Sequence, residues 1–254
     1  MSPLFQKLDS RSEGAYWAQA RHPLACLVFL LPLLAIYEFG ILYLGGADPS
    51  LLRNGADFWM RDWLGQAGLT DVLLLPALVA GGLLAWHVAG RYPWRISSET
   101  MLGMLAESIL FALGLVLLGQ IQDMAFARIG EPTWLAITSE ESLARTVSFV
   151  GAGVYEEFLF RMCLLPLCYG VFRLLLLRPQ WAIGLSIVAT SVLFSGAHYI
   201  GEGGEPFALF SFTFRAIAGL FFAGLFVLRG FGITVGAHAA YDILVGVLLD
   251  ASGS

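Results

Sequence analysis

The chain has 254 residues, of which 58% are hydrophobic and 13% are charged, with a net charge of −5 and a mean hydropathy of +0.76. A soluble domain carries about 25% charged residues, so a water-facing surface would need roughly twice this charge. The composition excludes a soluble enzyme, a disordered protein and a disulfide scaffold. No run of basic residues indicates nucleic acid as a partner. We therefore predict an integral membrane protein.

The N-terminal part begins with a polar stretch, residues 1–22, which we interpret as a soluble leader. Residues 23–44 are apolar and lack a small-residue cleavage pattern after them, so they predict an uncleaved first membrane helix. In residues 45–71, aromatic side chains alternate with charges at helical spacing. That pattern is typical of a helix lying along the membrane interface.

Further apolar spans follow along the chain. They are residues 72–88, 101–121, 181–200, 207–228 and 233–249. Residues 141–177 are almost continuously apolar and, at about 1.5 Å per residue, exceed one crossing of about 30 Å. They form either one long helix broken near Pro166 or two closely linked segments. The sequence thus predicts an all-α, polytopic bundle of seven to eight transmembrane helices.

We divide the chain into three parts: the leader (1–22), N-terminal transmembrane helices with an interfacial helix (23–140), and a core domain (141–250). Basic residues mark cytoplasmic segments, and they concentrate in the leader and in the turn that carries Arg91 and Arg95. We therefore expect a multi-pass protein of the bacterial inner (plasma) membrane with a cytoplasmic N-terminus.

Charged side chains inside the apolar spans gather in the second half of the chain. Each costs about 2.5–3.5 kcal/mol at the bilayer centre, so a protein retains it mainly for pairing or function. Glu157 and Arg161 are four residues apart on one helix face and form a predicted ion pair. Glu156, rotated by about 100°, has no partner at that spacing. Either Glu156 faces a functional cavity, or all three charges hold helices together.

Two histidines lie in later spans. His198 follows three small residues, which permit close helix approach or ligand access; a hydrogen-bonded core histidine is the alternative. His238 and Asp242 are one helical turn apart. Their spacing suits a metal pair, an acid–base couple or an oxyanion clamp, as well as simple structural hydrogen bonding.

These elements together resemble a known family. A doubled Glu with an Arg four residues later, then Phe-x-x-x-His, then His-x-x-x-Asp on separate apolar helices, resembles the CPBP family. That family includes CAAX prenyl endopeptidases of the Rce1 type and bacterial Abi proteins. The resemblance covers roughly residues 141–246. It implies peptide-bond hydrolysis inside the membrane by a glutamate-dependent mechanism.

The resemblance implies roles for single residues. Glu156 and His198 would hold and activate the attacking water, and His238 and Asp242 would face the developing oxyanion. Position 242 departs from the family, which often has Asn there. An Asp must be protonated, orient His238 or ligate a metal. Structural support is implied for Glu157, Arg161 and Phe194.

No cofactor is expected, but a zinc-dependent variant is an open alternative. Glu156, His198 and His238 would make a His₂Glu ligand set, as in many zinc peptidases. The chain has no His-Glu-x-x-His motif, however.

We therefore predict an intramembrane endopeptidase whose partners are a membrane-bound protein or peptide substrate and the lipid bilayer. The alternatives are a non-catalytic protein of the same fold, such as a bacteriocin-immunity or scaffold factor, and a transporter with a proton relay.

Overall fold

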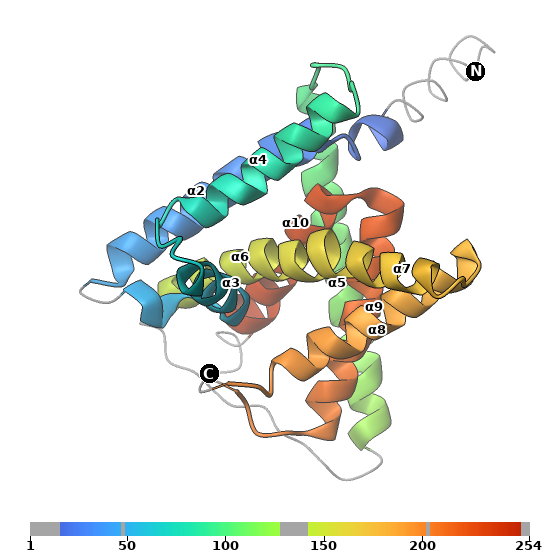
Figure 1. The fold of residues 1–254 in the computed structure, drawn as a ribbon. Coiled ribbons are helices and arrows are strands. Elements are labelled where there is room, and N and C mark those ends of the chain that lie inside the picture. The colour runs from blue at the N-terminus through green and yellow to red at the C-terminus, as the bar shows by residue number, and fades with distance from the viewer. Residues whose placement is uncertain (1–15, 47–48, 128–141, 202–203, 250–254) are drawn as a thin grey trace, which may run out of the picture.

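The computed structural model describes residues 16–46, 49–127, 142–201 and 204–249 (Figure 1). All regular structure within these ranges is helical, so the predicted all-α class is confirmed. Four helices are long and apolar enough to cross a membrane, and two shorter apolar helices accompany them. The four are Pro23–Leu44, Ser98–Phe126, Pro179–Ala197 and Leu209–Arg229, and the shorter two are Leu74–Ala89 and Phe231–Val247.

The N-terminal half forms a run of helices with short connections. They are α2 (Pro23–Leu44), η1 (Pro49–Leu52), α3 (Gly55–Gln66), α4 (Leu74–Ala89) and α5 (Ser98–Ala127). The bounds of α2 are the predicted ones. The predicted span at residues 101–121 is shorter than the helix, because α5 begins at Ser98 and continues to Ala127. The Gln122 amide donates to the Phe210 carbonyl over 2.9 Å, which anchors this extension to the neighbouring helix.

The C-terminal half holds the remaining helices. They are α6 (Ser142–Glu157), the π-helical turn η3 (Phe158–Leu164), α7 (Leu165–Leu174), α8 (Pro179–Ala197), α9 (Leu209–Arg229), α10 (Phe231–Ile243) and η4 (Leu244–Leu249). Figure 1 shows α6 and α7 following one line, so the segment is one long irregular helix. The irregularity is the π turn, just before Pro166. Proline has no N–H to donate, and its ring clashes with the carbonyl four residues earlier.

The centre of the bundle is α10, which packs against α2, α5, α6 and α9. Every residue from Phe231 to Ala239 is buried. An apolar helix buried on all sides belongs in a core rather than against lipid. On one flank, α2 and α4 lie side by side, and on the other, α8 packs on α7 and α9 (Figure 1).

A glycine brings α6 and α10 unusually close. A Cβ at Gly153 would lie 2.8 Å from the backbone nitrogen of Ala239 and 3.0 Å from the carbonyl oxygen of Val235. Only glycine leaves room for this approach. The close contact places the end of α6, where Glu156 and Glu157 lie, beside His238 on α10.

Candidate active site

The structure brings together the four predicted catalytic side chains, which come from α6, the end of α8 and α10. Glu156 Oε2 lies 4.0 Å from Nε2 of His198 and 3.9 Å from Nε2 of His238. The same His238 nitrogen is 3.4 Å from Oδ2 of Asp242. Spacing along the chain permitted this meeting but did not establish it, because His198 had to reach the depth of His238.

The ring of His198 is oriented by its own helix. His198 is the C-cap residue of α8, and its Nδ1 lies 2.9 Å from the carbonyl oxygen of Phe194. A carbonyl only accepts hydrogen bonds, so Nδ1 carries a proton and donates it. The neutral ring therefore presents the lone pair of Nε2 toward Glu156.

The ring of His238 is oriented by Glu157. Nδ1 of His238 lies 2.8 Å from Oε1 of Glu157, whose other oxygen is 3.0 Å from Nε of Arg161. A carboxylate that pairs with a guanidinium is ionised and accepts, so His238 donates from Nδ1. Its Nε2 then points toward Glu156 and Asp242.

The predicted Glu157–Arg161 pair is present, but the second contact of Glu157 was not predicted. Glu157 and His238 are 81 residues apart, and no pattern within a single helix indicates their contact. The site thus joins two units. In one, Glu157 is ion-paired to Arg161 and hydrogen-bonded to His238; in the other, His198 is hydrogen-bonded to Phe194.

Aromatic rings enclose these groups. The Arg161 guanidinium lies 4.6 Å from the centre of the Phe194 ring and donates to the Gly219 carbonyl over 3.2 Å. Phe222 stacks on His238 with a centroid distance of 4.5 Å and an interplanar angle of 15°. Phe194 matches its predicted supporting position, whereas Phe222 carries no motif that indicates it. The apolar rings limit water to the open side of the site.

The open side is a cavity of about 570 Å³ between α3, α5, α6, α8, α9 and α10. Six of its described lining residues are Phe or Tyr, and all four candidate catalytic residues line it. Among its described lining residues, Arg215 is the one Lys or Arg, and it pairs with Glu205 over 2.7 Å.

The distances between these side chains differ from those between the ligands of a zinc site. Two ligands of a tetrahedral zinc with bonds of about 2.0–2.1 Å lie about 3.3 Å apart. The Nε2 atoms of His198 and His238 are 4.0 and 3.9 Å from the Glu156 oxygen. Across the described residues, no group of three or more His, Cys, Asp and Glu side chains is placed to hold a metal ion. The three residues as they stand do not fit a zinc-ligand set.

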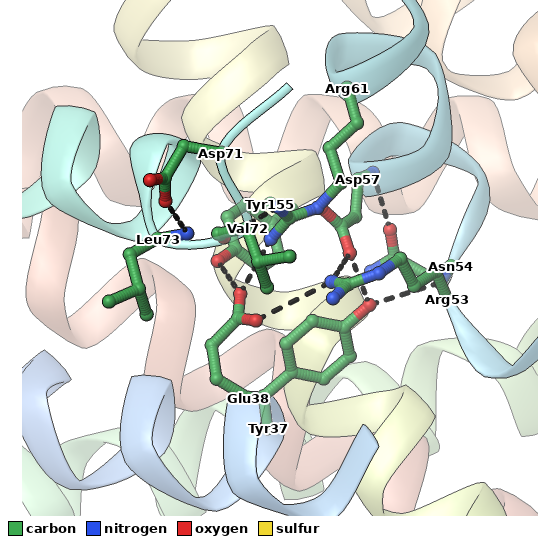
Figure 2. Close-up of polar contacts among 10 residues, drawn as sticks. All are labelled: Tyr37, Glu38, Arg53, Asn54, Asp57, Arg61, Asp71, Val72, Leu73 and Tyr155. Carbon is green, nitrogen blue, oxygen red and sulfur yellow. Dashed lines mark hydrogen bonds and ion pairs between the residues drawn. The ribbon is translucent and has the colours of Figure 1, made fainter. Parts of the chain in front are cut away.

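A second buried cluster joins α2, α3 and α6, and we call it the polar network (Figure 2). Its members are Tyr37, Glu38, Arg53, Asp57, Arg61 and Tyr155. Asp57 accepts from Arg53 and Arg61, both over 2.6 Å, so two guanidinium groups offset two carboxylates. Tyr155, directly before Glu156, donates to Glu38 over 2.5 Å.

Fold and site together define a helical membrane protein with a carboxylate–histidine site inside its bundle. Residues 138–244 match the family model described as type II CAAX prenyl endopeptidase Rce1-like. The chain thus contains an Rce1-like domain, which confirms the resemblance that the three motifs indicated. All four candidate catalytic residues lie within the matched range. No curated protein and no solved structure matches the chain.

Proposed function

We propose that the protein is an intramembrane endopeptidase in which Glu156 activates water without a metal ion. The observation that carries this proposal is the position of the Glu156 carboxylate, 4.0 and 3.9 Å from two histidine nitrogens. These distances exceed a direct hydrogen bond of about 2.7–3.2 Å. They fit a water molecule that hydrogen-bonds to the carboxylate and to a ring nitrogen at the same time.

The proposed steps follow from these positions. Glu156 takes a proton from the water as the water attacks the peptide carbonyl. Nε2 of His198 receives that proton and delivers it to the departing amine as the C–N bond breaks. His238, with a proton on Nε2 as well as on Nδ1, and a protonated Asp242 donate to the oxyanion that forms on the carbonyl oxygen. Glu157 keeps His238 in the orientation that this donation requires.

The substrate that we propose is a membrane-bound protein or peptide. The aromatic cavity supports apolar residues around the cleaved bond. The matched family is named for CAAX prenyl endopeptidases, so a prenylated CAAX peptide is the first probe. We also propose that the N-terminus faces the cytoplasm, since Arg91 and Arg95 lie in the turn between α4 and α5.

The central test is cleavage of the probe peptide by protein in liposomes. Glu156→Gln and His198→Ala should each lower the rate by about 10²–10⁴-fold, the usual contribution of general acid–base catalysis. Glu99→Gln, on the exposed first turn of α5, makes the same chemical change outside the cavity and should cleave normally. Near-normal cleavage by Glu156→Gln or His198→Ala would contradict the water-activation roles.

The natural substrate can be identified by trapping. Glu156→Gln keeps the size and shape of the side chain, so it should retain uncut substrate in the cavity. Mass spectrometry of membrane proteins that accumulate with Glu156→Gln, and not with wild type, names the candidates.

Metal dependence has its own test. Cleavage should persist after EDTA or phenanthroline treatment, and metal analysis should find less than one zinc per chain. Loss of activity that zinc alone restores would assign the zinc mechanism instead.

A further inference from the structure

The cavity has one wall from outside the Rce1-like domain. Asn54 and Gly55, at the start of α3, line the same cavity as Glu156. They precede the matched range, residues 138–244. This wall is part of the site that the proposed endopeptidase would present to its substrate.

Asn54, on this wall, carries a buried hydrogen-bond donor without a partner among the described residues. Its Oδ1 accepts from the backbone N–H of Asp57 over 2.8 Å, which makes Asn54 the N-cap of α3. Its own N–H donates to the Tyr37 hydroxyl over 3.3 Å. The side chain is buried, yet Nδ2 has no hydrogen-bond partner among the described residues. A buried donor without an acceptor destabilises a fold, so proteins satisfy such groups with water or a ligand.

The backbone next to Asn54 is also open. A Cβ at Gly55 would meet no atom within 4 Å. The first N–H groups of a helix have no intrahelical acceptor, and they carry the positive end of the helix dipole. The start of the 12-residue helix α3 therefore adds donors beside Nδ2.

The polar network holds this wall in place (Figure 2). Arg53 directly precedes Asn54, and Asp57 follows in the first turn of α3. Asp57 is fully buried and accepts from Arg53, from Arg61 and, over 2.8 Å, from the Tyr37 hydroxyl. Two guanidinium groups neutralise its carboxylate, so it does not cancel the positive end of α3. The donors of this wall are thus fixed before any ligand arrives.

We propose that Asn54 and the first turn of α3 form a substrate subsite that binds an acceptor oxygen of the peptide. The oxygen belongs to a main-chain carbonyl or to a terminal carboxylate, because only acceptors satisfy Nδ2 and the helix N–H groups. The subsite holds the peptide while Glu156 acts on the bond to be cleaved. This inference rests on the proposed endopeptidase function and adds a part of the site that lies outside the family domain.

The key variant is Asn54→Asp. Asp caps a helix as well as Asn does, so α3 keeps its cap, but the donor is replaced by a negative charge. The dissociation constant of the probe peptide for Glu156→Gln protein in nanodiscs should rise at least tenfold when Asn54→Asp is added. In the active protein KM should rise similarly, with kcat within about twofold and an unchanged melting temperature.

A matched control lies at the other end of the same helix. Gln66→Glu makes the same amide-to-carboxylate change on an exposed residue, and peptide binding should not change.

Two versions of the probe peptide distinguish a main-chain carbonyl oxygen from a terminal carboxylate oxygen as the group that the subsite binds. If the subsite binds a terminal carboxylate, a peptide with a carboxamide end binds weakly, and its dissociation constant does not change in Asn54→Asp. If it takes a main-chain carbonyl, both peptides lose affinity equally.

The outcomes separate this inference from the endopeptidase function. Cleavage by wild type with unchanged binding and KM in Asn54→Asp overturns the subsite and leaves the function standing. Binding that depends on Asn54 without any cleavage overturns the function and leaves the subsite standing. If the probe does not bind to the Glu156→Gln protein at all, the subsite is overturned as well.

Discussion

Glu157 forms an ion pair with Arg161 and accepts a hydrogen bond from His238, so one buried charge supports both the helix and the site. Arg161 is 1% exposed and Glu157 is fully buried. Removing the guanidinium would leave the carboxylate with His238 as its remaining hydrogen-bond partner among the described residues. We therefore expect loss of Arg161 to lower the stability of the protein more than it changes the catalytic reaction.

Arg161→Ala is therefore expected to destabilise the protein, by about 3–5 kcal/mol on the scale of broken buried pairs in soluble proteins. Glu156→Gln should have a much smaller effect. The measurement is the melting temperature in detergent, with Arg173→Ala on the exposed end of α7 as a control. Adding Glu157→Gln to Arg161→Ala should recover part of the loss. A wild-type melting temperature for Arg161→Ala would show that the pair contributes nothing.

Asp242 is the position where the sequence departs from the commoner family pattern. Nδ1 of His238 is committed to Glu157, so its Nε2 faces Asp242, 3.4 Å away, and Glu156. Three groups that could each release a proton meet at this point. At least one of them must retain a proton for these contacts to be favourable.

We expect Asp242 to retain a proton and to act as an oxyanion donor beside His238. Asp242→Asn then supplies an N–H at the same place, and activity should persist or rise. A carboxylic acid loses its proton as the pH rises and an amide does not, so the alkaline fall of the pH–rate profile should flatten in Asp242→Asn. A large loss of activity in this variant at every pH would mean that position 242 supplies a negative charge.

At the level of helices, the site depends on the close contact of α6 with α10. Gly153 is the residue that permits it, because a Cβ there would lie within 3.0 Å of α10 backbone atoms. A shift of α6 away from α10 would separate Glu157 from His238 and Glu156 from both histidines.

Gly153→Ala should therefore lower the melting temperature and slow cleavage, even though alanine stabilises an isolated helix by about 1 kcal/mol relative to glycine. Gly170→Ala is the matched control, since a Cβ on α7 there meets no atom within 4 Å. That variant should be as stable as wild type or more so. Equal melting temperatures for the two variants would contradict the close-contact argument.

In the whole molecule, the N-terminal helices are tied to the Rce1-like domain by buried charges. Tyr155 of α6 joins the polar network, and Arg229 of α9 makes two hydrogen bonds to Glu107 of α5, over 2.7 and 2.6 Å. The indole ring of Trp17 lies 3.6 Å from the Arg229 guanidinium carbon. These groups are satisfied only when both halves are present.

Residues 142–254 expressed alone should therefore fail to fold, because Arg229 and Tyr155 would lose their partners in the apolar interior. Co-expression with residues 1–141 as a separate chain should restore folding and cleavage. Size-exclusion chromatography and the probe assay measure both. An isolated C-terminal half with wild-type stability and activity would contradict this dependence.

The sequence alone determined the membrane location, the all-α class and the three family motifs. Composition and helical periodicity are local properties, and a charge in an apolar helix is conspicuous wherever its partner lies. That was enough to name Glu156, His198, His238 and Asp242 as candidates and to pair Glu157 with Arg161. Their catalytic roles are still predictions.

Only the tertiary structure decided which of these groups meet. The contact of His238 with Glu157, the pairing of Glu107 with Arg229 and the place of Asn54 on the cavity wall join residues far apart in the chain. Such contacts depend on which helix faces pack together, and helix packing depends on close approaches such as the one at Gly153. A pattern within one helix cannot specify the neighbour that its polar face will meet.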